Sequence, residues 1–324
     1  TAQIVVVDAE GQQVPYQITS DEKVIFPVTV QANGSAVYTI KAGIPQECPV
    51  KACGRYYPER VDDVAWENDL TAFRAYGPAL QETGERAFGY DIWTKYNTTE
   101  PVVEARYEGE LNPDMKAKIA ELGKTDPKAA QELYRSVSYH VDHGNGLDCY
   151  KVGPTLGGGT TALMAGDTII YPYCYATQEI LDNGPLRFTV KLVYNPLVVK
   201  GDSTIIETRI ITLDAGSYCN KTVVSYTNLK ETMPLAVGIV LHEPDGAIVA
   251  DAANGYMTYV DPTDNAGGDN GKIFVGAAFP TLVKEAKAVL FPEKEKKELR
   301  GGADGHVLAI SEYEPGADFT YYWG

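Results

Sequence analysis

A short segment of this chain, Asp62 to Pro78, combines side chains that bind anions with others that are typical of a protein core. It reads DDVAWENDLTAFRAYGP, and from Asn68 onward its residues alternate as in a strand. Because side chains two apart lie on one face of a strand, we expect Asn68, Arg74 and Tyr76 to point the same way. An amide, a guanidinium and a phenol on one face are suited to hold a carboxylate or a sugar.

A purely structural role is the competing interpretation of this segment. Trp66 and Phe73 are most simply core residues. Glu67 and Arg74 would then form an ordinary ion pair. In the functional interpretation, Trp66, Glu67 and Asn68 contact a substrate. Glu67 also orients Arg74, the residue that binds the substrate's carboxylate.

A second dense polar segment favours function. Residues 139–153 read YHVDHGNGLDCYKVG and contain two of the four histidines. Histidine exchanges protons near neutral pH, and glycine lets the backbone turn sharply or approach a ligand. The candidate acid–base groups here are His140, His143, Tyr150 and Lys151, and the first segment adds Arg74 and Tyr76 as candidate catalytic residues.

Three interpretations of this second segment remain open. His140, Asp142 and His143 could bind a divalent metal ion, since His and Asp are common ligands. Alternatively, the histidines transfer protons, with Asp142 setting a tautomer and contacting substrate. In the third interpretation Asp142 simply orients a histidine in a turn. His242 follows an apolar strand and is a further candidate for substrate binding, or it simply caps a turn.

Composition narrows the classes of function. The formal charge of −16 argues against nucleic acid as a partner, because phosphates would be repelled. No apolar run is long enough to span a bilayer. The five cysteines show no metal-ligand spacing, and no Gly-x-Ser-x-Gly motif is present. A serine or cysteine nucleophile is therefore disfavoured, and no cofactor is required beyond the possible metal ion.

The pattern predicts one mostly β domain over residues 1–324 with a large antiparallel sandwich. Strands are expected in residues 1–45, with a hairpin turn at Asn33-Gly34. A helical insertion is expected over 112–135, where Asn112-Pro113 and Asp126-Pro127 are cap-and-proline signals. Residues 293–300 are expected to be a loop. Further strands are predicted at 168–175, 186–194, 204–213, 221–228, 235–242, 247–251, 255–260, 272–275, 306–311 and 319–323.

Taken together, residues 63–78, 140–159 and 319–324 resemble the domain-of-unknown-function family 4861. The matching motifs are DVAWEND, AFRAYGP, HVDHG, GLDCYKVG, LGGG and FTYYWG. The resemblance implies a sandwich related to mutarotase-like and lyase supersandwiches. It also implies a bacterial protein of polysaccharide breakdown, with a branch that removes water from the terminal uronic acid of ulvan oligosaccharides. The implied location is periplasmic, cell-surface or secreted, and because the chain starts at Thr1 we expect that a leader was removed or the chain trimmed.

The residues and the resemblance together predict β-elimination from a uronic acid. Such a site must neutralise the carboxylate, remove the C5 proton and protonate the departing hydroxyl. Arg74 with Asn68 would hold the carboxylate, and His143 or His140 would be the base. Tyr150 or Tyr76 would be the acid, with support from Lys151.

Two alternatives belong to other classes. A glycoside hydrolase would pair Glu67 with Asp142 or Asp148. A carbohydrate-binding protein would hold the acidic oligosaccharide without chemistry.

Overall fold

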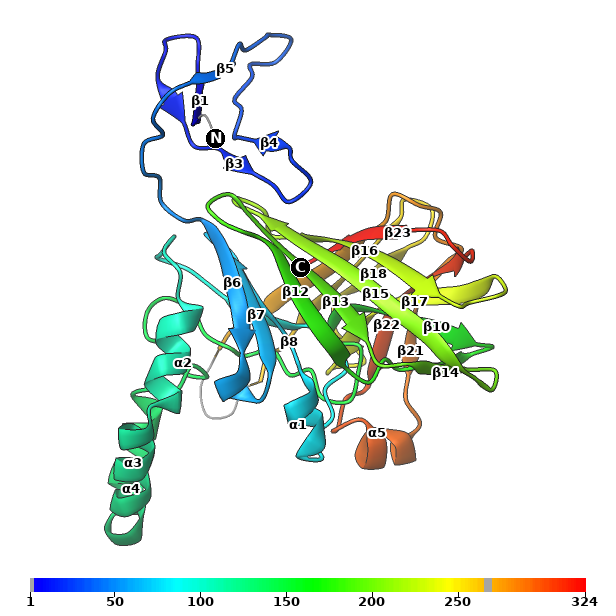
Figure 1. Ribbon diagram of the computed structural model, residues 1–324. Coiled ribbons are helices and arrows are strands. Elements are labelled where there is room, and N and C mark those ends of the chain that lie inside the picture. The colour runs from blue at the N-terminus through cyan, green and yellow to red at the C-terminus, as the bar shows by residue number, and fades with distance from the viewer. Residues whose placement is uncertain (1–2, 265–269) are drawn as a thin grey trace.

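The computed structural model describes residues 3–264 and 270–324, and Figure 1 shows their arrangement. The chain is mostly β, and every pairing between its named strands is antiparallel, as the sequence predicts. Among these described residues, no helix is long and apolar enough to cross a membrane.

Two large sheets enclose the main core. The larger has the order β12-β13-β15-β16-β23-β20-β19-β18, with β14 beside β15. Its strands are β12 (Tyr175–Asn183), β13 (Arg187–Tyr194), β14 (Leu197–Val199), β15 (Asp202–Asp214), β16 (Asn220–Thr227), β18 (Ile248–Asp251), β19 (Tyr256–Asp261), β20 (Ile273–Ala278) and β23 (Phe319–Trp323). The smaller has the order β11-β10-β17-β22-β21. Its strands are β10 (Gly158–Ala165), β11 (Thr168–Ile169), β17 (Met233–Leu241), β21 (Glu285–Leu290) and β22 (Gly305–Tyr313).

Buried residues of both sheets belong to one apolar cluster, which includes Phe188 and Val237. Alternating burial along β16 and β20 follows from the two-residue period of a strand. The predicted strands from residue 186 to the C-terminus are confirmed, with end shifts of a few residues. The predicted strand 168–175 is shorter than expected, because β11 covers only Thr168–Ile169.

A four-stranded sheet, β6-β7-β8-β9, carries the first polar segment. Its strands are β6 (Ala52–Tyr57), β7 (Asp63–Asn68), β8 (Thr71–Ala75) and β9 (Asp91–Thr94), and a 3₁₀ turn, η1 (Pro58–Arg60), precedes β7. On one face Trp66 stacks on Phe188 of β13, which joins this sheet to the main core. The other face carries a separate cluster of buried aromatic residues.

The helical region is longer than predicted. It contains α2 (Val103–Leu111), α3 (Pro113–Thr125) and α4 (Pro127–Arg135), which project from the sheets in Figure 1. Both predicted caps are confirmed: the Asn112 and Asp126 side chains accept bonds from the Met115 and Ala129 amides. Two further helices are α1 (Pro78–Glu82) and α5 (Glu293–Leu299). The loop expected at 293–300 is therefore wrong, because Glu293 and Glu295 favour a helix start and Lys296 and Lys297 a helix end.

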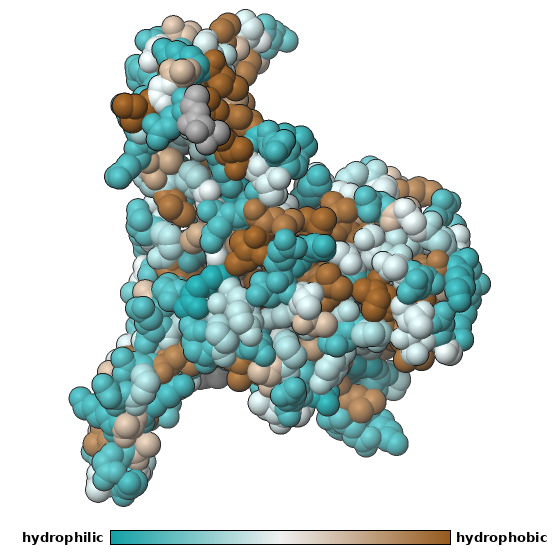
Figure 2. All heavy atoms as spheres, in the orientation of Figure 1, coloured by the Kyte–Doolittle hydropathy of each residue, from teal (hydrophilic) through white to brown (hydrophobic). Residues whose placement is uncertain are grey.

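The N-terminal strands lie at one end of the molecule (Figure 1). They are β1 (Ile4–Val7), β2 (Gln13–Val14), β3 (Gln17–Ile18), β4 (Val24–Ile25) and β5 (Thr39–Ala42). Asn33 forms a turn with positive φ, but β5 pairs with β1 rather than with residues 28–30. The predicted hairpin is therefore wrong, because long-range pairing replaced the local one. Apolar side chains are exposed here, among them Val37 and Ile44, and Figure 2 shows them on this region.

Candidate functional site

The hairpin of β7 and β8 decides which residues of the first segment share a face. Its register pairs Ala65 with Arg74 and Trp66 with Phe73. Arg74 therefore points to the same side as Ala65, whereas the Asn68 side chain binds the carbonyls of Asp214 and Ser217 on the opposite side. The expected shared face of Asn68 and Arg74 is wrong, because the chain turns between them and does not continue as one strand.

A strained turn leads into β7. Val61 and Asp62 both have positive φ, which is rare for a β-branched residue. The amide of Ala79 and the hydroxyl of Tyr56 donate to the Asp62 carboxylate and hold the turn. A Cβ atom at Gly77 would lie 2.0 Å from the Asp62 carbonyl oxygen, so only glycine permits this approach. The turn fixes the position of Arg60, which directly precedes it.

Arg74 lies at the centre of an arginine–carboxylate cluster, defined here as Arg74, Asp63, Asp91 and Asp148. Its Nη2 donates to the carboxylate of Asp91 and, at 2.7 Å, to that of Asp148. Its Nη1 lies 3.7 Å from Asp63 Oδ2. All four side chains are buried. Burying so many charges is costly unless each is paired. Removing any one of these residues would therefore leave another buried charge without its partner.

Aromatic rings surround the cluster. The Arg74 guanidinium lies 4.9 Å from the ring centre of Tyr76 and 5.2 Å from that of Trp93, and the Tyr76 hydroxyl accepts a bond from Nη2 at 3.2 Å. Tyr107 of α2 donates its hydroxyl to Asp63 Oδ2 at 3.1 Å. Trp93 stacks on Tyr139, with ring centres 5.0 Å apart. These rings exclude water and strengthen the electrostatic interactions inside.

The carboxylates of the cluster outnumber its cations. Three carboxylates face two guanidiniums, those of Arg74 and Arg60, so full ionisation would leave one buried negative charge in excess. Burial raises the pKa of Asp63 to about 7, against the opposing effect of Arg74 and Arg60. Burial and the neighbouring Asp91 raise the pKa of Asp148 to about 6. The cluster therefore takes up a proton near neutral pH.

The cluster reaches solvent at what we call the His140 edge, formed by the exposed parts of Arg60 and His140 and by the buried Tyr139, which contacts both. His140 is half exposed, and its Nδ1 lies 3.2 Å from the Asp148 carbonyl oxygen and 3.7 Å from the Asp148 carboxylate. Arg60 Nε donates to the Tyr139 hydroxyl at 2.9 Å, and the Tyr139 and His140 rings lie 4.5 Å apart. The carbonyl contact requires a proton on Nδ1, which leaves Nε2 of the neutral ring with a free electron pair.

The other polar residues of this loop hold its shape. His143 Nε2 lies 2.9 Å from the Ser138 carbonyl oxygen, and Asp142 accepts bonds from the amides of Gly144 and Gly146. His140, Asp142 and His143 thus have separate partners. The described residues contain no group of three or more His, Cys, Asp or Glu side chains arranged to hold a metal ion. Gly146, with φ of +95°, allows the loop to approach β9 closely.

Glu67, Asn68 and Trp66 have structural partners. The Glu67 carboxylate accepts bonds from the amides of Val102 and Val103 at the start of α2, and a third from Lys95 Nζ at 2.8 Å. It anchors the helix that carries Tyr107, and it does not orient Arg74 as expected. Trp66 is buried in the core. The Asn68 side-chain oxygen accepts hydrogen bonds from the backbone amides of Leu70 and Thr71, in the turn that follows β7.

A histidine–aspartate pair lies at the ends of β17 and β19. His242 Nδ1 is 2.6 Å from Asp261 Oδ2, and the Asp261 side chain is completely buried. His242 Nε2 has no hydrogen-bond partner among the residues that the structure describes. Tyr150 packs edge-on to His242, but its hydroxyl donates to the Gly157 carbonyl, and burial raises the pKa of Tyr150 well above its ordinary value. Lys151 is exposed.

Several residues of these sites had no sequence signal. Arg60 precedes the polar segment, Asp91 begins strand β9, and Asp261 ends strand β19. Tyr139 directly precedes His140, so its position beside the histidine was the easiest of these to predict. The partners of Arg74 come from chain positions far apart, which only the fold brings together.

Comparison with known sequences identifies the family of this chain. The sequence model of DUF4861, a domain of unknown function, matches residues 1–324. This chain belongs to the DUF4861 family. It is similar to Uncharacterized protein P7 of Formosa agariphila, with 28% identity over 227 residues, which make up 68% of this chain and 51% of that protein. The DUF4861 chain thus spans about half the length of this curated relative. The expected family is confirmed, and the ulvan-directed branch stays a prediction.

Proposed function

We propose that this DUF4861 protein removes water from the terminal uronic acid of an acidic oligosaccharide by β-elimination. The observation that carries the proposal is the His140 edge, where a half-exposed histidine, a phenol and a guanidinium lie together over a buried carboxylate. These are the groups that the reaction needs: a base, an acid and a cation for the substrate's carboxylate.

His140 is the base in this proposal. Its Nδ1 is held at Asp148, so the free Nε2 removes the C5 proton of the sugar. The C5–H electron pair forms the C4–C5 double bond as the C4–O bond breaks. The Asp148 carboxylate stabilises the resulting imidazolium when it is ionised, as a buried carboxylate does for a catalytic histidine.

Arg60 binds the substrate's carboxylate. Its guanidinium is partly exposed: Nε donates to the Tyr139 hydroxyl, Nη1 lies 4.0 Å from Asp63 Oδ2, and Nη2 makes no hydrogen bond to the described residues. A planar guanidinium matches a carboxylate and stabilises the charge that develops on it during C5 deprotonation. Arg74, the residue expected for this role, is buried and neutralised by Asp91 and Asp148. Its role here is to position Asp148.

Tyr139 supplies the proton for the departing hydroxyl. Its oxygen accepts a bond from Arg60, so its own proton is free to be donated. The group leaves as water, and the proton on His140 returns to the Tyr139 oxygen through solvent. Burial raises the pKa of Tyr139, and the guanidiniums of Arg74 and Arg60 oppose this rise because they stabilise the phenolate that forms when the proton is donated.

The contacts give less support to the other two functions. For hydrolysis, Glu67 would need a free carboxylate, and its oxygens are used by the start of α2 and by Lys95. A binding protein would not need the proton-sharing carboxylates behind His140. The proposal requires no cofactor, and a divalent metal ion is an addition to be tested. We place the reaction in the periplasm or outside the cell, in line with the family resemblance.

Incubation with a panel of uronic-acid oligosaccharides tests the proposal. At least one member should give a product that absorbs in the near ultraviolet and has lost one water. The His140→Asn variant should lower the rate by about 10²–10⁴-fold, and Arg60→Met by on the order of 100-fold. His143→Asn, in the same loop, is the control and should retain the rate within a few-fold. Saturated products only, or no product from any member, would contradict the proposal.

A further inference from the structure

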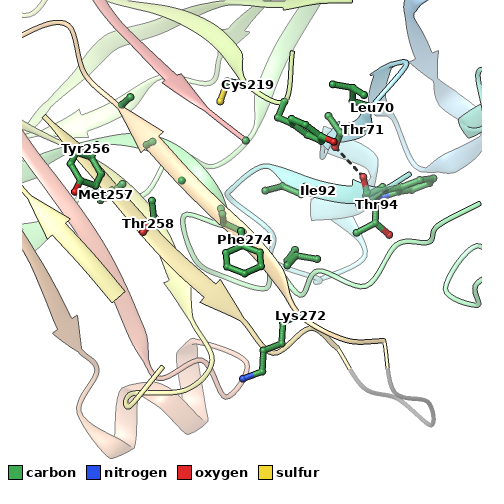
Figure 3. Close-up of a pocket in the computed structure, with 18 of the residues that line it drawn as sticks. Leu70, Thr71, Ile92, Thr94, Cys219, Tyr256, Met257, Thr258, Lys272 and Phe274 are labelled. Atoms are coloured by element: carbon green, nitrogen blue, oxygen red, sulfur yellow. Dashed lines mark hydrogen bonds between the residues drawn. The ribbon is translucent and has the colours of Figure 1, made fainter. Parts of the chain in front are cut away.

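An apolar groove lies on the other side of β9 from the arginine–carboxylate cluster. It is a cavity of about 650 Å³ between the paired strands β8 and β9 on one side and strands β19 and β20 on the other (Figure 3). Leu70, Thr71, Ile92 and Thr94 line one wall, and Tyr256, Thr258 and Phe274 belong to the opposite wall. This volume is in the range of pockets that bind small ligands.

Exposed aromatic rings distinguish this groove from the protein core. Phe274 is 80% exposed and Tyr218 is 67% exposed. On β20 the buried positions are Ile273, Val275 and Ala277, so Phe274 is on the outward face, where polar residues are expected. The next outward positions, Gly276 and Ala278, are small and leave space beside the ring. An apolar surface of this kind usually marks a binding site.

The charge of the groove is opposite to that of the whole chain. The formal charge of the protein is −16, yet the described residues that line the groove include no aspartate or glutamate. Lys272 is exposed at this site and has no ion-pair partner among the described residues. Lys95, the other lining cation, is bound to Glu67. The lining therefore suits an anionic ligand that also has an apolar face.

We propose that this groove binds a sugar unit of an acidic saccharide chain, stacked on Phe274 and Tyr218, with its carboxylate toward Lys272. A pyranose ring has one face of C–H groups, which packs on an aromatic ring, and hydroxyls at its rim. Thr258 and Tyr218 supply hydroxyl groups that make no hydrogen bond to the described residues. The choice of ligand rests on the proposed function, but the groove and the His140 edge are separate sites.

Calorimetric titration in the His140→Asn background tests this proposal without turnover. The probes are tetrasaccharides from ulvan, pectin and alginate, with neutral xylotetraose for comparison. Phe274→Ala and Tyr218→Ala should each weaken binding of an acidic tetrasaccharide by about tenfold. Lys272→Gln should reduce the preference for acidic over neutral probes by a few-fold. Tyr173→Ala, which alters a tyrosine that is 40% exposed and lies outside the groove lining, should leave binding unchanged.

The outcomes separate the two proposals. Unchanged affinity in both aromatic variants would overturn the groove assignment, even if elimination is observed. The absence of binding to any probe would also overturn it. If Phe274→Ala instead converts a dimer to a monomer and leaves sugar binding intact, the groove is a contact between two copies and the assignment is wrong. Weakened binding in these variants supports the groove even if no elimination product forms.

Discussion

Two regions of this protein pair a histidine with a buried aspartate, and they differ in what surrounds the pair. At the His140 edge, the carboxylate of Asp148 is shared with Arg74, and Arg60 is nearby. At β17 and β19, His242 binds Asp261 at 2.6 Å, and the described residues give Asp261 no guanidinium partner. The second pair has the shorter contact, but no lysine or arginine of the described residues forms an ion pair with Asp261.

This difference teaches that a short histidine–aspartate contact alone does not identify a site for uronic acids. Removing a proton beside a carboxylate requires that the carboxylate be neutralised, and the His140 edge contains a partly exposed guanidinium, that of Arg60. The two regions are linked through residues 148–150, since Asp148 belongs to one and Tyr150 to the other. Variants in each region therefore test which one acts.

The largest effect on stability is expected from Arg74→Met. The change leaves Asp63, Asp91 and Asp148 buried without their shared cation, so the free energy of unfolding should fall by about 3–5 kcal/mol in urea denaturation. The control is Arg55→Met, because Arg55 pairs with Glu59 and Glu104 at the surface. It should cost less than about 1 kcal/mol. Equal losses for the two variants would mean that the cluster is not strongly coupled.

A pH-dependent effect, spread over several pH units, is expected from Asp63→Asn. Folded Asp63 keeps its proton up to about pH 7, whereas the unfolded chain loses it near the ordinary value of 3.8. Between these pH values the folded state binds more protons, so the contribution of Asp63 to stability falls as pH rises, by up to about 1.4 kcal/mol per pH unit.

The unfolding free energy of the unaltered protein minus that of Asp63→Asn should thus fall from about pH 4 to about pH 7 and be constant above. Denaturation at several pH values measures this difference. A difference that does not change with pH would show that Asp63 is ionised throughout, and the proton-sharing account of the cluster would have to be abandoned.

The smallest effect is expected from Tyr150→Phe. The variant loses one hydrogen bond to the Gly157 carbonyl, which should lower the free energy of unfolding by about 1 kcal/mol and leave the rate of elimination unchanged. Steady-state kinetics and denaturation of the same preparation measure both. A large loss of rate would instead make Tyr150 the acid and move the reaction to the region of His242.

The sequence was most informative where the chemistry is local. The two helix caps at Asn112 and Asp126 were predictable because a cap and its amide lie within one turn. The strands from residue 186 onward were predictable from their alternation and turn residues. The family was recognised from motifs within single segments.

The site was predictable only in part, because its contacts join residues that are far apart in the sequence. Arg74 was expected to hold the substrate's carboxylate, but its pairing with Asp91 and Asp148 depends on the packing of β9 and of the loop that carries Asp148, which the sequence does not reveal. Arg60 acquires its place from a strained turn with no clear sequence signature. Because β7 and β8 are joined by a turn, the rule that residues two apart share a face does not extend from Asn68 to Arg74.

A side-by-side measurement of kcat/KM for His140→Asn and His242→Asn tests the central claim most directly. Both variants remove one imidazole and keep a polar side chain of similar size. On a uronic-acid oligosaccharide that the unaltered protein dehydrates, His140→Asn should lose about 10²–10⁴-fold and His242→Asn only a few-fold. The reverse order, with His242→Asn inactive and His140→Asn active, would contradict the account.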